Sequence, residues 1–131
     1  MIDQSMELWH RIVKERDIKG LASFLDPDVT FHSPVLFEPQ QGIKLTTFYL
    51  AAALQVLGNE HFTYVRELRD PPNAVLEFTT DIDGVIVNGV DMIQFNDKGL
   101  AIEFKVMLRP MKGIQIVQQR MFEMLGQMKK G

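Results

Sequence analysis

The first half of the chain carries apolar side chains at the spacing of α-helices. Residues 2–16 have an apolar residue at every third or fourth position with charges between them, which predicts an amphipathic helix. A second, shorter helix is predicted from Asp17, whose side chain can cap the first turn, to Pro27, which ends it. Residues 43–57 are apolar almost all round and are followed by Gly58, a residue typical of helix ends. We therefore expect three helices in this half, the third of them buried on most of its faces.

Other segments show the period of two that is typical of β-strands. Residues 28–35 predict a short strand that is broken by Pro34. After Gly58 the alternation becomes regular and predicts four consecutive strands with turn-forming residues between them. These strands cover residues 61–69, 74–82, 85–95 and 100–108. A final amphipathic helix is predicted after Pro110, with a stripe made of Ile114, Val117, Met121, Met124 and Leu125.

The pair Asp83 and Gly84 predicts how two of these strands align. A type I′ hairpin turn needs positive φ at both central residues, and Asp-Gly is among the pairs that supply it. With this two-residue turn, Leu76 faces Asp91 on a side of the sheet that is otherwise apolar except for one threonine. Across the next turn, Asp91 is expected near Val106. The carboxyl group of Asp91 is therefore expected to point into an apolar layer.

Composition limits the function classes. The 131 residues are 46% apolar and 24% charged, as in ordinary globular proteins, so we expect residues 1–131 to form a single domain. The net charge of −3 gives no electrostatic footprint for nucleic acid or an anionic membrane, and the longest apolar stretch, residues 48–54, is far shorter than the ~20 residues of a membrane span. Cysteine is absent and the first residues lack the pattern of a signal peptide, so we expect a cytoplasmic protein.

Two stretches resemble the ketosteroid isomerases of the nuclear-transport-factor-2-like superfamily. Residues 28–49 resemble the isomerase segment in which a strand, a proline and a glycine-containing loop lead into a helix that bears Phe-Tyr. Residues 89–99 resemble the isomerase strand whose aspartate precedes an apolar run and a turn that ends in glycine. The resemblance implies an α+β, cystatin-like fold: a cone-shaped, curved antiparallel sheet wrapped around the N-terminal helices, with a C-terminal helix. It also implies that residues 1–131 are a single SnoaL-like domain.

The resemblance also implies roles for individual residues. Asp91 matches the isomerase aspartate that stays protonated and donates a hydrogen bond to the oxyanion. Tyr49 matches the tyrosine of the hydrogen-bond network behind the oxyanion hole. The general-base aspartate, however, falls on Ser33, and the oxyanion-hole tyrosine falls on or next to Trp9. Because a serine cannot shuttle the proton, we do not expect steroid isomerisation by the family mechanism.

These positions predict an apolar cavity with a few convergent polar groups, which is how small-molecule sites are generally built. Asp91 and Tyr49 are the candidate catalytic residues. An alternative for Asp91 is an ion pair at the rim of the sheet with one of three arginines, Arg66, Arg69 or Arg109. The residues expected around the substrate are Trp9, Ser33, Phe78, Thr80, Phe104, Val106 and Leu108.

The histidines give weaker signals. His32 lies beside Ser33 and could act as a base, but strand alternation places the two side chains on opposite faces, which favours a surface or interface histidine. His10 and His61 lack a third ligand at any recognised metal spacing, and no glycine-rich phosphate loop is present. We therefore expect no metal and no cofactor.

Two classes of function follow. In the first, the protein binds a small apolar molecule, with acid–base catalysis of the isomerase, cyclase or hydrolase type on a carbonyl or hydroxylated compound at Asp91. In the second, it is a non-catalytic ligand-binding or dimerisation module that uses the outer face of the sheet. The mix of apolar and polar residues on that face suits a homodimer. Neither class involves nucleic acid or a membrane.

Overall fold

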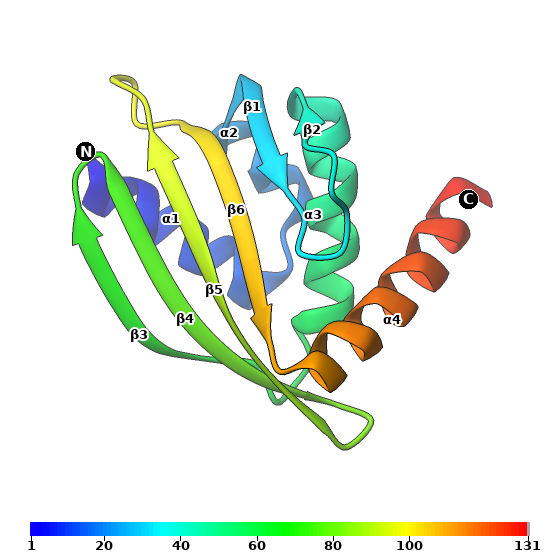
Figure 1. Ribbon diagram of the computed structural model, residues 1–131. Coiled ribbons are helices and arrows are strands. Elements are labelled where there is room, and N and C mark those ends of the chain that lie inside the picture. The colour runs from blue at the N-terminus through cyan, green and yellow to red at the C-terminus, as the bar shows by residue number, and fades with distance from the viewer. Residues whose placement is uncertain (131) are drawn as a thin grey trace.

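The computed structural model describes residues 1–130, and the predicted helices and strands appear in the predicted order, together with a short strand at Gln40–Gln41 that was not predicted (Figure 1). The helical elements are α1 (Ile2–Glu15), the 3₁₀ turn η1 (Ile18–Gly20), α2 (Leu21–Phe24), α3 (Ile43–Leu57) and α4 (Met111–Lys130). The strands are β1 (Leu25–His32), β2 (Gln40–Gln41), β3 (Thr63–Asp70), β4 (Asn73–Ile82), β5 (Val85–Phe95) and β6 (Ala101–Arg109). The α+β class is confirmed.

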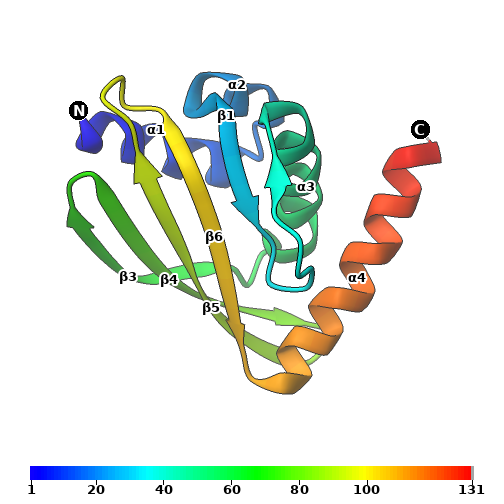
Figure 2. The same ribbon diagram turned by 45° about the horizontal axis from the view of Figure 1, so that its top comes forward.

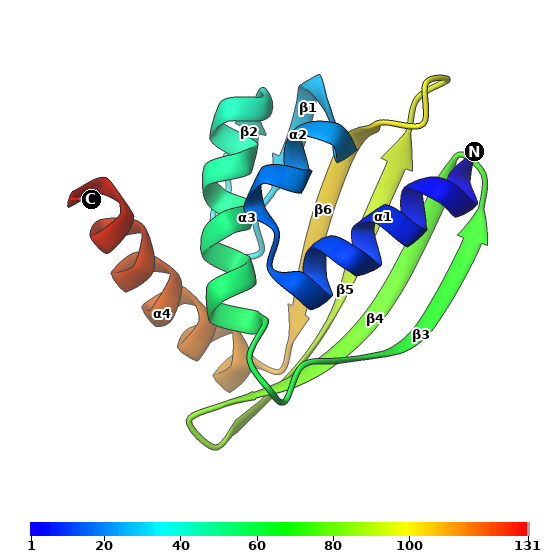
Figure 3. The ribbon, with the colours of Figure 1, turned by 180° about the vertical axis from the view of Figure 1, so that it is seen from behind.

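The strands form one curved, open sheet in the order β2-β1-β6-β5-β4-β3. Strands β3 to β6 make the predicted antiparallel meander. The sheet as a whole is mixed rather than antiparallel, because β1 pairs with β6 in parallel and with β2 in antiparallel orientation. The sequence pattern could not show this, since no tight turn joins β1 to β6 and their relative direction is set by the path through α3. Helices α1, α2 and α3 cover the concave face (Figure 3).

The turn between β4 and β5 has the predicted conformation. Asp83 and Gly84 have φ values of 52° and 85°, as a type I′ turn requires. The resulting register pairs Leu76 with Asp91, and β6 places Val106 opposite Asp91. The face assignment from the sequence is confirmed, and it turns the side chain of Asp91 toward the helices.

The second predicted helix is shorter than expected. It consists of the 3₁₀ turn η1 and the single turn α2, and Leu25 is already extended. Pro27 restricts the residue before it to extended conformations, so β1 begins ahead of the proline rather than after it. The predicted cap is present, because the Asp17 carboxylate accepts a hydrogen bond from the Gly20 amide at 3.1 Å.

Two apolar clusters stabilise the molecule. The larger one lies between the concave face and helices α1 to α3, where the Trp9 ring is 5.0 Å from both Phe24 and Phe104, measured between centroids. The smaller one lies under α4 and buries Val117 and Met121 of the predicted stripe. Helix α4 leaves the end of β6 and projects beside α3 (Figure 2). The concave face is thus filled by α1 to α3, and α4 closes one end of the sheet.

Candidate functional site

A chain of hydrogen bonds joins three elements at the centre of the concave face. Asp91 of β5 is buried, with 6% of its surface exposed. The Tyr64 hydroxyl of β3 donates to Asp91 Oδ2 at 2.6 Å, and the Trp9 indole Nε1–H of α1 donates to the same hydroxyl oxygen at 2.9 Å. Each polar group in this apolar layer is therefore satisfied by another.

Burial dominates the protonation of this chain. It raises the pKa of Asp91 to about 7, although the hydrogen bond from Tyr64 acts in the opposite direction. Burial, followed by the adjacent charge of Asp91, also raises the pKa of Tyr64 well above its ordinary value. Tyr64 therefore keeps its proton at neutral pH, while Asp91 can gain or lose one.

Within the described part of the chain, Asp91 forms no ion pair with an arginine. Arg66 pairs with Glu77 at 3.4 Å, and Arg69 pairs with Glu67 and with Asp3. The alternative that Asp91 forms an ion pair at the rim of the sheet is therefore wrong. The physical reason is that Arg66 lies opposite Glu77 on the outer face and Arg69 lies near the far end of β3. Arg109 ends β6 and pairs with Asn88 in the register, whereas Asp91 pairs with Val106.

Asp91 faces a small apolar cavity. The cavity has a volume of about 40 Å³, which is room for about one or two water molecules. Asp91 supplies the one carboxylate among its lining residues, and Tyr64 and Trp9 supply the hydroxyl and the indole N–H. The full lining consists of Trp9, Val13, Leu50, Ala53, Leu54, Leu57, Gly58, Phe62, Tyr64, Phe78, Asp91, Phe104 and Val106.

The cavity brings together five of the residues expected at the site. These are Asp91, Trp9, Phe78, Phe104 and Val106. Gly89 makes the placement of one of them possible, because it lies directly opposite Phe78 in the sheet. A Cβ atom at Gly89 would lie 2.6 Å from Phe78 Cζ, so the ring can cross the sheet surface only over a glycine.

The other four expected residues lie outside the cavity lining. Tyr49 packs against the larger apolar cluster and edge-on to Phe48. Ser33 is buried near the end of β1, where its hydroxyl accepts the Val35 amide at 3.2 Å. Leu108 packs against both apolar clusters.

Thr80, the fourth of these residues, shapes the cavity from outside it. Its hydroxyl donates to Asn59 Oδ1 at 2.9 Å, and Asn59 in turn donates to the Asp81 carbonyl at 2.9 Å. These bonds tie the loop between α3 and β3 to β4. Because that loop carries Gly58 and Phe62 of the cavity wall, Thr80 helps to position the wall.

Tyr64 is a site residue that the sequence pattern does not predict. Simple alternation places it with Arg66 and Leu68 on the outer face. A β-bulge at Val65 inserts one extra residue, so that Tyr64 pairs with Phe78 while Arg66 pairs with Glu77. The bulge turns Tyr64 inward. A signal was nevertheless available, since the chain has two tyrosines and this one lies in a strand next to the predicted Asp91 strand pair.

A second hollow adjoins the cavity on its solvent side. It has a volume of about 370 Å³ and shares four lining residues with the cavity: Val13, Gly58, Phe62 and Tyr64. We call this hollow the mouth. Its remaining lining residues are His10, Lys14, Arg16 and Asn59.

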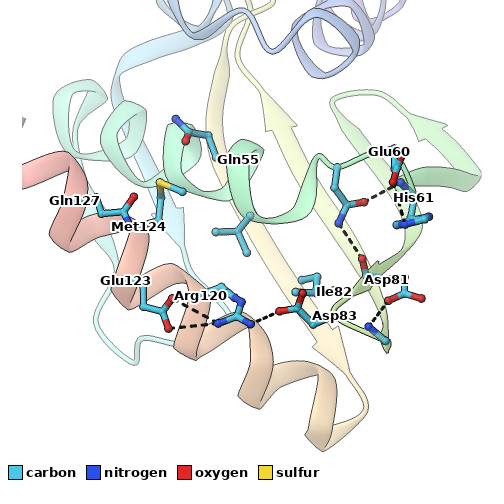
Figure 4. A pocket seen from close by; sticks show the side chains of 13 residues that line it. Gln55, Glu60, His61, Asp81, Ile82, Asp83, Arg120, Glu123, Met124 and Gln127 are labelled. Carbon is cyan, nitrogen blue, oxygen red and sulfur yellow. Dashed lines mark hydrogen bonds and ion pairs between the residues drawn. The ribbon is translucent and has the colours of Figure 1, made fainter.

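Helix α4 borders a larger surface hollow of about 610 Å³, between the end of α3 and the β4–β5 turn (Figure 4). Its most prominent group, Arg120, lies between Asp83 and Glu123 and pairs with both. The hollow is open and its charged groups largely satisfy one another. The buried titratable group lies in the smaller cavity, which we therefore regard as the candidate site.

His32 lies where strand alternation placed it. Its Nε2 atom is 3.6 Å from a carboxylate oxygen of Glu103, an outer-face residue of β6. Among the described residues, no group of three or more histidine, aspartate or glutamate side chains could hold a metal ion. None of the helices in the described part of the chain is both long and apolar enough to cross a membrane.

Comparison with known proteins agrees with this architecture. The family model of the SnoaL-like domain matches residues 6–104, so the chain belongs to the SnoaL-like domain family. A structure described as a steroid delta-isomerase from Pseudomonas aeruginosa is 33% identical, with a TM-score of 0.93 over 99% of this chain and 95% of that chain. An uncharacterised protein with a cystatin-like fold from Silicibacter pomeroyi is 26% identical, with a TM-score of 0.84 over 91% and 83%. Among curated proteins, none matches the chain.

Proposed function

We propose that this protein binds a small, mostly apolar molecule at the Asp91 cavity and acts by acid–base chemistry on a carbonyl or hydroxyl oxygen of that molecule. The observation that carries the proposal is the buried Asp91–Tyr64–Trp9 chain at the floor of an apolar cavity. A titratable group with a strongly raised pKa in such a cavity is typical of catalytic sites.

The hydrogen bonds that the site can offer to a ligand depend on the protonation state of Asp91. When Asp91 is ionised, the Tyr64 proton points at the carboxylate, and the Tyr64 oxygen accepts the Trp9 indole N–H. When Asp91 gains a proton, its carboxyl group becomes a donor and no longer requires the Tyr64 proton. Both groups can then donate to one oxygen of a ligand, which stabilises negative charge that develops on that oxygen. Asp91 and Tyr64 are the proposed catalytic residues, and Trp9 holds Tyr64 in position.

The similar structures support a small-molecule role. The Pseudomonas aeruginosa protein is described as a steroid delta-isomerase. A putative polyketide cyclase from Sinorhizobium meliloti, at 13% identity, and TerC, crystallised with polyporic acid, at 19% identity, share only the fold. We do not extend the proposal to steroids. Asp91 is the one carboxylate of the cavity lining, Ser33 lies outside it, and about 40 Å³ is far below the 300–1,000 Å³ of typical ligand pockets.

A second candidate function is a non-catalytic binding or dimerisation module. It is favoured by one observation, the apolar residues that the outer face of the sheet exposes. These are Leu68, Ile86, Met92 and Met107. In this alternative a homodimer forms through the sheets, and the cavity contributes only stability. Either function is compatible with a cytoplasmic protein, which we continue to propose because the chain has no cysteine.

Trp9 provides the test, because it is the chain's one tryptophan and its indole N–H ends the hydrogen-bond chain. Titration with small aromatic ketones and phenols, followed by tryptophan fluorescence and melting temperature, should give saturable binding. Tyr64→Phe should weaken that binding about tenfold, since it removes a donor from the ligand oxygen.

Tyr49→Phe makes the same chemical change at the other tyrosine, and comparing the two variants identifies which of them serves the ligand. Flat titrations with all compounds, together with a concentration-dependent dimer, would reject the primary proposal in favour of the module. An equal loss of binding in Tyr49→Phe would contradict a specific role of the Tyr64 hydroxyl at the ligand oxygen.

A further inference from the structure

The mouth of the cavity has an unusual charge distribution for an acidic protein. The chain has a net charge of −3, yet the mouth is lined by Lys14, Arg16 and His10 and by no carboxylate. His10 is already engaged, because its Nε2 atom is 2.6 Å from Glu67 Oε1. Lys14 and Arg16 are the two fixed positive charges that remain.

The nearest acids along the chain do not neutralise these two cations. Glu15 and Asp17 both pair with Arg11, at 3.8 Å and 3.1 Å. Within the part of the chain whose side chains are described, neither Lys14 nor Arg16 forms an ion pair. Because Arg11 pairs with both nearby carboxylates, the positive charges of Lys14 and Arg16 at the mouth are available to a ligand.

Arg16 also occupies a backbone conformation that does not suit an arginine. It is the C-cap of α1, with φ 52° and ψ 44° in the left-handed region, where glycine or asparagine is the usual residue. A cation at a helix C-terminus interacts favourably with the helix dipole, which accounts for Lys14 in the last turn. The left-handed backbone conformation costs Arg16 conformational energy that a glycine at this position would not incur. The helix dipole therefore does not explain why an arginine, rather than a glycine, occupies the C-cap.

We infer that the natural ligand of the Asp91 cavity is an amphipathic carboxylate, whose acidic group binds at the mouth between Lys14 and Arg16. The inference rests on the proposed function and names the class of its ligand. The volumes agree with this orientation, since the cavity admits only a slim end of a ligand and the mouth is about 370 Å³. The slim end carries the carbonyl or hydroxyl oxygen to Asp91, and Phe62 and Val13 contact the apolar part between the two ends.

The test uses matched pairs of neutral and anionic probes. The probes are 4-acetylphenyl alkanoic acids of increasing chain length, each measured beside its own methyl ester by Trp9 fluorescence. In buffer of about 20 mM ionic strength, one acid of the series should bind about tenfold more tightly than its ester, as two exposed ion pairs would give. In about 0.5 M NaCl the preference should fall to about twofold or less, while binding of the ester should stay unchanged.

Three variants locate the charge. Lys14→Gln and Arg16→Gly should each weaken binding of the acid about threefold and leave binding of the ester unchanged. Arg16→Gly should also leave the melting temperature unchanged or raise it, since glycine fits the left-handed conformation. If Arg16 had only a structural role, Arg16→Gly would lower the melting temperature and leave binding of the acid unchanged. Lys19→Gln is the control, because it makes the same change of net charge at an exposed residue that does not line the mouth.

The outcomes separate this inference from the function on which it rests. Equal affinity for acid and ester would overturn the anionic ligand and leave the Asp91 site intact. A loss of acid binding in Lys19→Gln as large as in Lys14→Gln would overturn it as well, because the effect would then be one of net charge. Absence of binding by every acid and every ester would reject the proposed function itself.

Discussion

At the scale of single residues, Asp91 controls the state of the site. In the unfolded chain an aspartate has a pKa of about 3.9, whereas burial raises the pKa of folded Asp91 to about 7. Between these two values the folded protein binds more protons than the unfolded chain, so stability falls as pH rises through this range. Asp91 therefore contributes its full stability below about pH 4 and loses that contribution as pH passes about 7.

Asp91→Asn tests this linkage. The variant keeps the shape and can still accept the Tyr64 hydroxyl, but it does not titrate. At about pH 8.5 it should be more stable than the wild type, by up to about 4 kcal/mol, and near pH 4 the advantage should vanish. Urea unfolding of both proteins at the two pH values measures the difference. A wild type that is the more stable at pH 8.5 and loses its margin on acidification would show that Asp91 is stabilised as an anion.

The sequence predicts the position of Asp91 in the apolar layer, but it does not predict that Tyr64 is its hydrogen-bond partner. A two-residue turn was enough to place Asp91 on the apolar face, because alternation and the turn give one register. Tyr64 depends on a bulge, and no turn residue or breaking residue marks the bulge in the sequence. Of the positions to which the resemblance gave a role, Asp91 and Trp9 line the cavity, whereas Ser33 and Tyr49 lie outside its lining.

At the scale of elements, the contact between β4 and β5 positions one side of the cavity lining. Gly89 lets the Phe78 ring lie across the sheet, and Phe78 stacks on Phe62 with ring centroids 5.1 Å apart. Phe62 in turn lies on the loop that Asn59 and Thr80 tie to β4. This side of the cavity is thus built from one strand and one loop, and it depends on the space above a single glycine.

Gly89→Ala should destabilise the protein by about 1–3 kcal/mol. The new methyl group would lie 2.6 Å from Phe78 Cζ and 2.7 Å from the Met107 carbonyl oxygen, and backbone cannot move aside cheaply. Gly126→Ala is the matched control: that position lies in α4 with open space around it, so the change should be neutral or stabilising by about 0.5–1 kcal/mol. Thermal unfolding of both variants measures the contrast. Equal melting temperatures would mean that Phe78 can turn aside without cost.

Element-level prediction was accurate wherever a local signal defined the ends. The bounds of α3 and of β5 agree with the sequence pattern, because Gly42 and Gly58 flank the helix and the Asp-Gly turn begins the strand. The second helix and β1 were shifted, since Pro27 favours extended structure in the residue before it. The parallel pairing of β1 with β6 joins segments far apart in the chain, and alternation carries no information about it.

At the scale of the whole molecule, the outer face of the sheet is the surface that the helices leave uncovered (Figure 2). We expect it to form a homodimer. Met107→Glu should convert the dimer to a monomer, because Met107 is 48% exposed on this face and a carboxylate there would be buried without a partner.

Phe122→Glu is the control for the dimer, since Phe122 is 52% exposed but lies on α4. Sedimentation velocity over a range of protein concentrations distinguishes the two variants. A wild type that sediments as a monomer at every concentration, or a Phe122 variant that alone loses the dimer, would refute assembly through the sheet.

The extra residue in β3 also affects how the sequences of related proteins should be aligned with this one. In a relative whose third strand lacks the extra residue, the position equivalent to Val65 would pair with Phe78 in place of Tyr64. The side chain at that position would then point toward the equivalent of the Asp91 carboxylate. A tyrosine displaced by one column in an alignment can therefore occupy the same point in space. An alignment without a gap in this strand would therefore report that the tyrosine is absent from the relative, although both the tyrosine and the aspartate that it contacts are present.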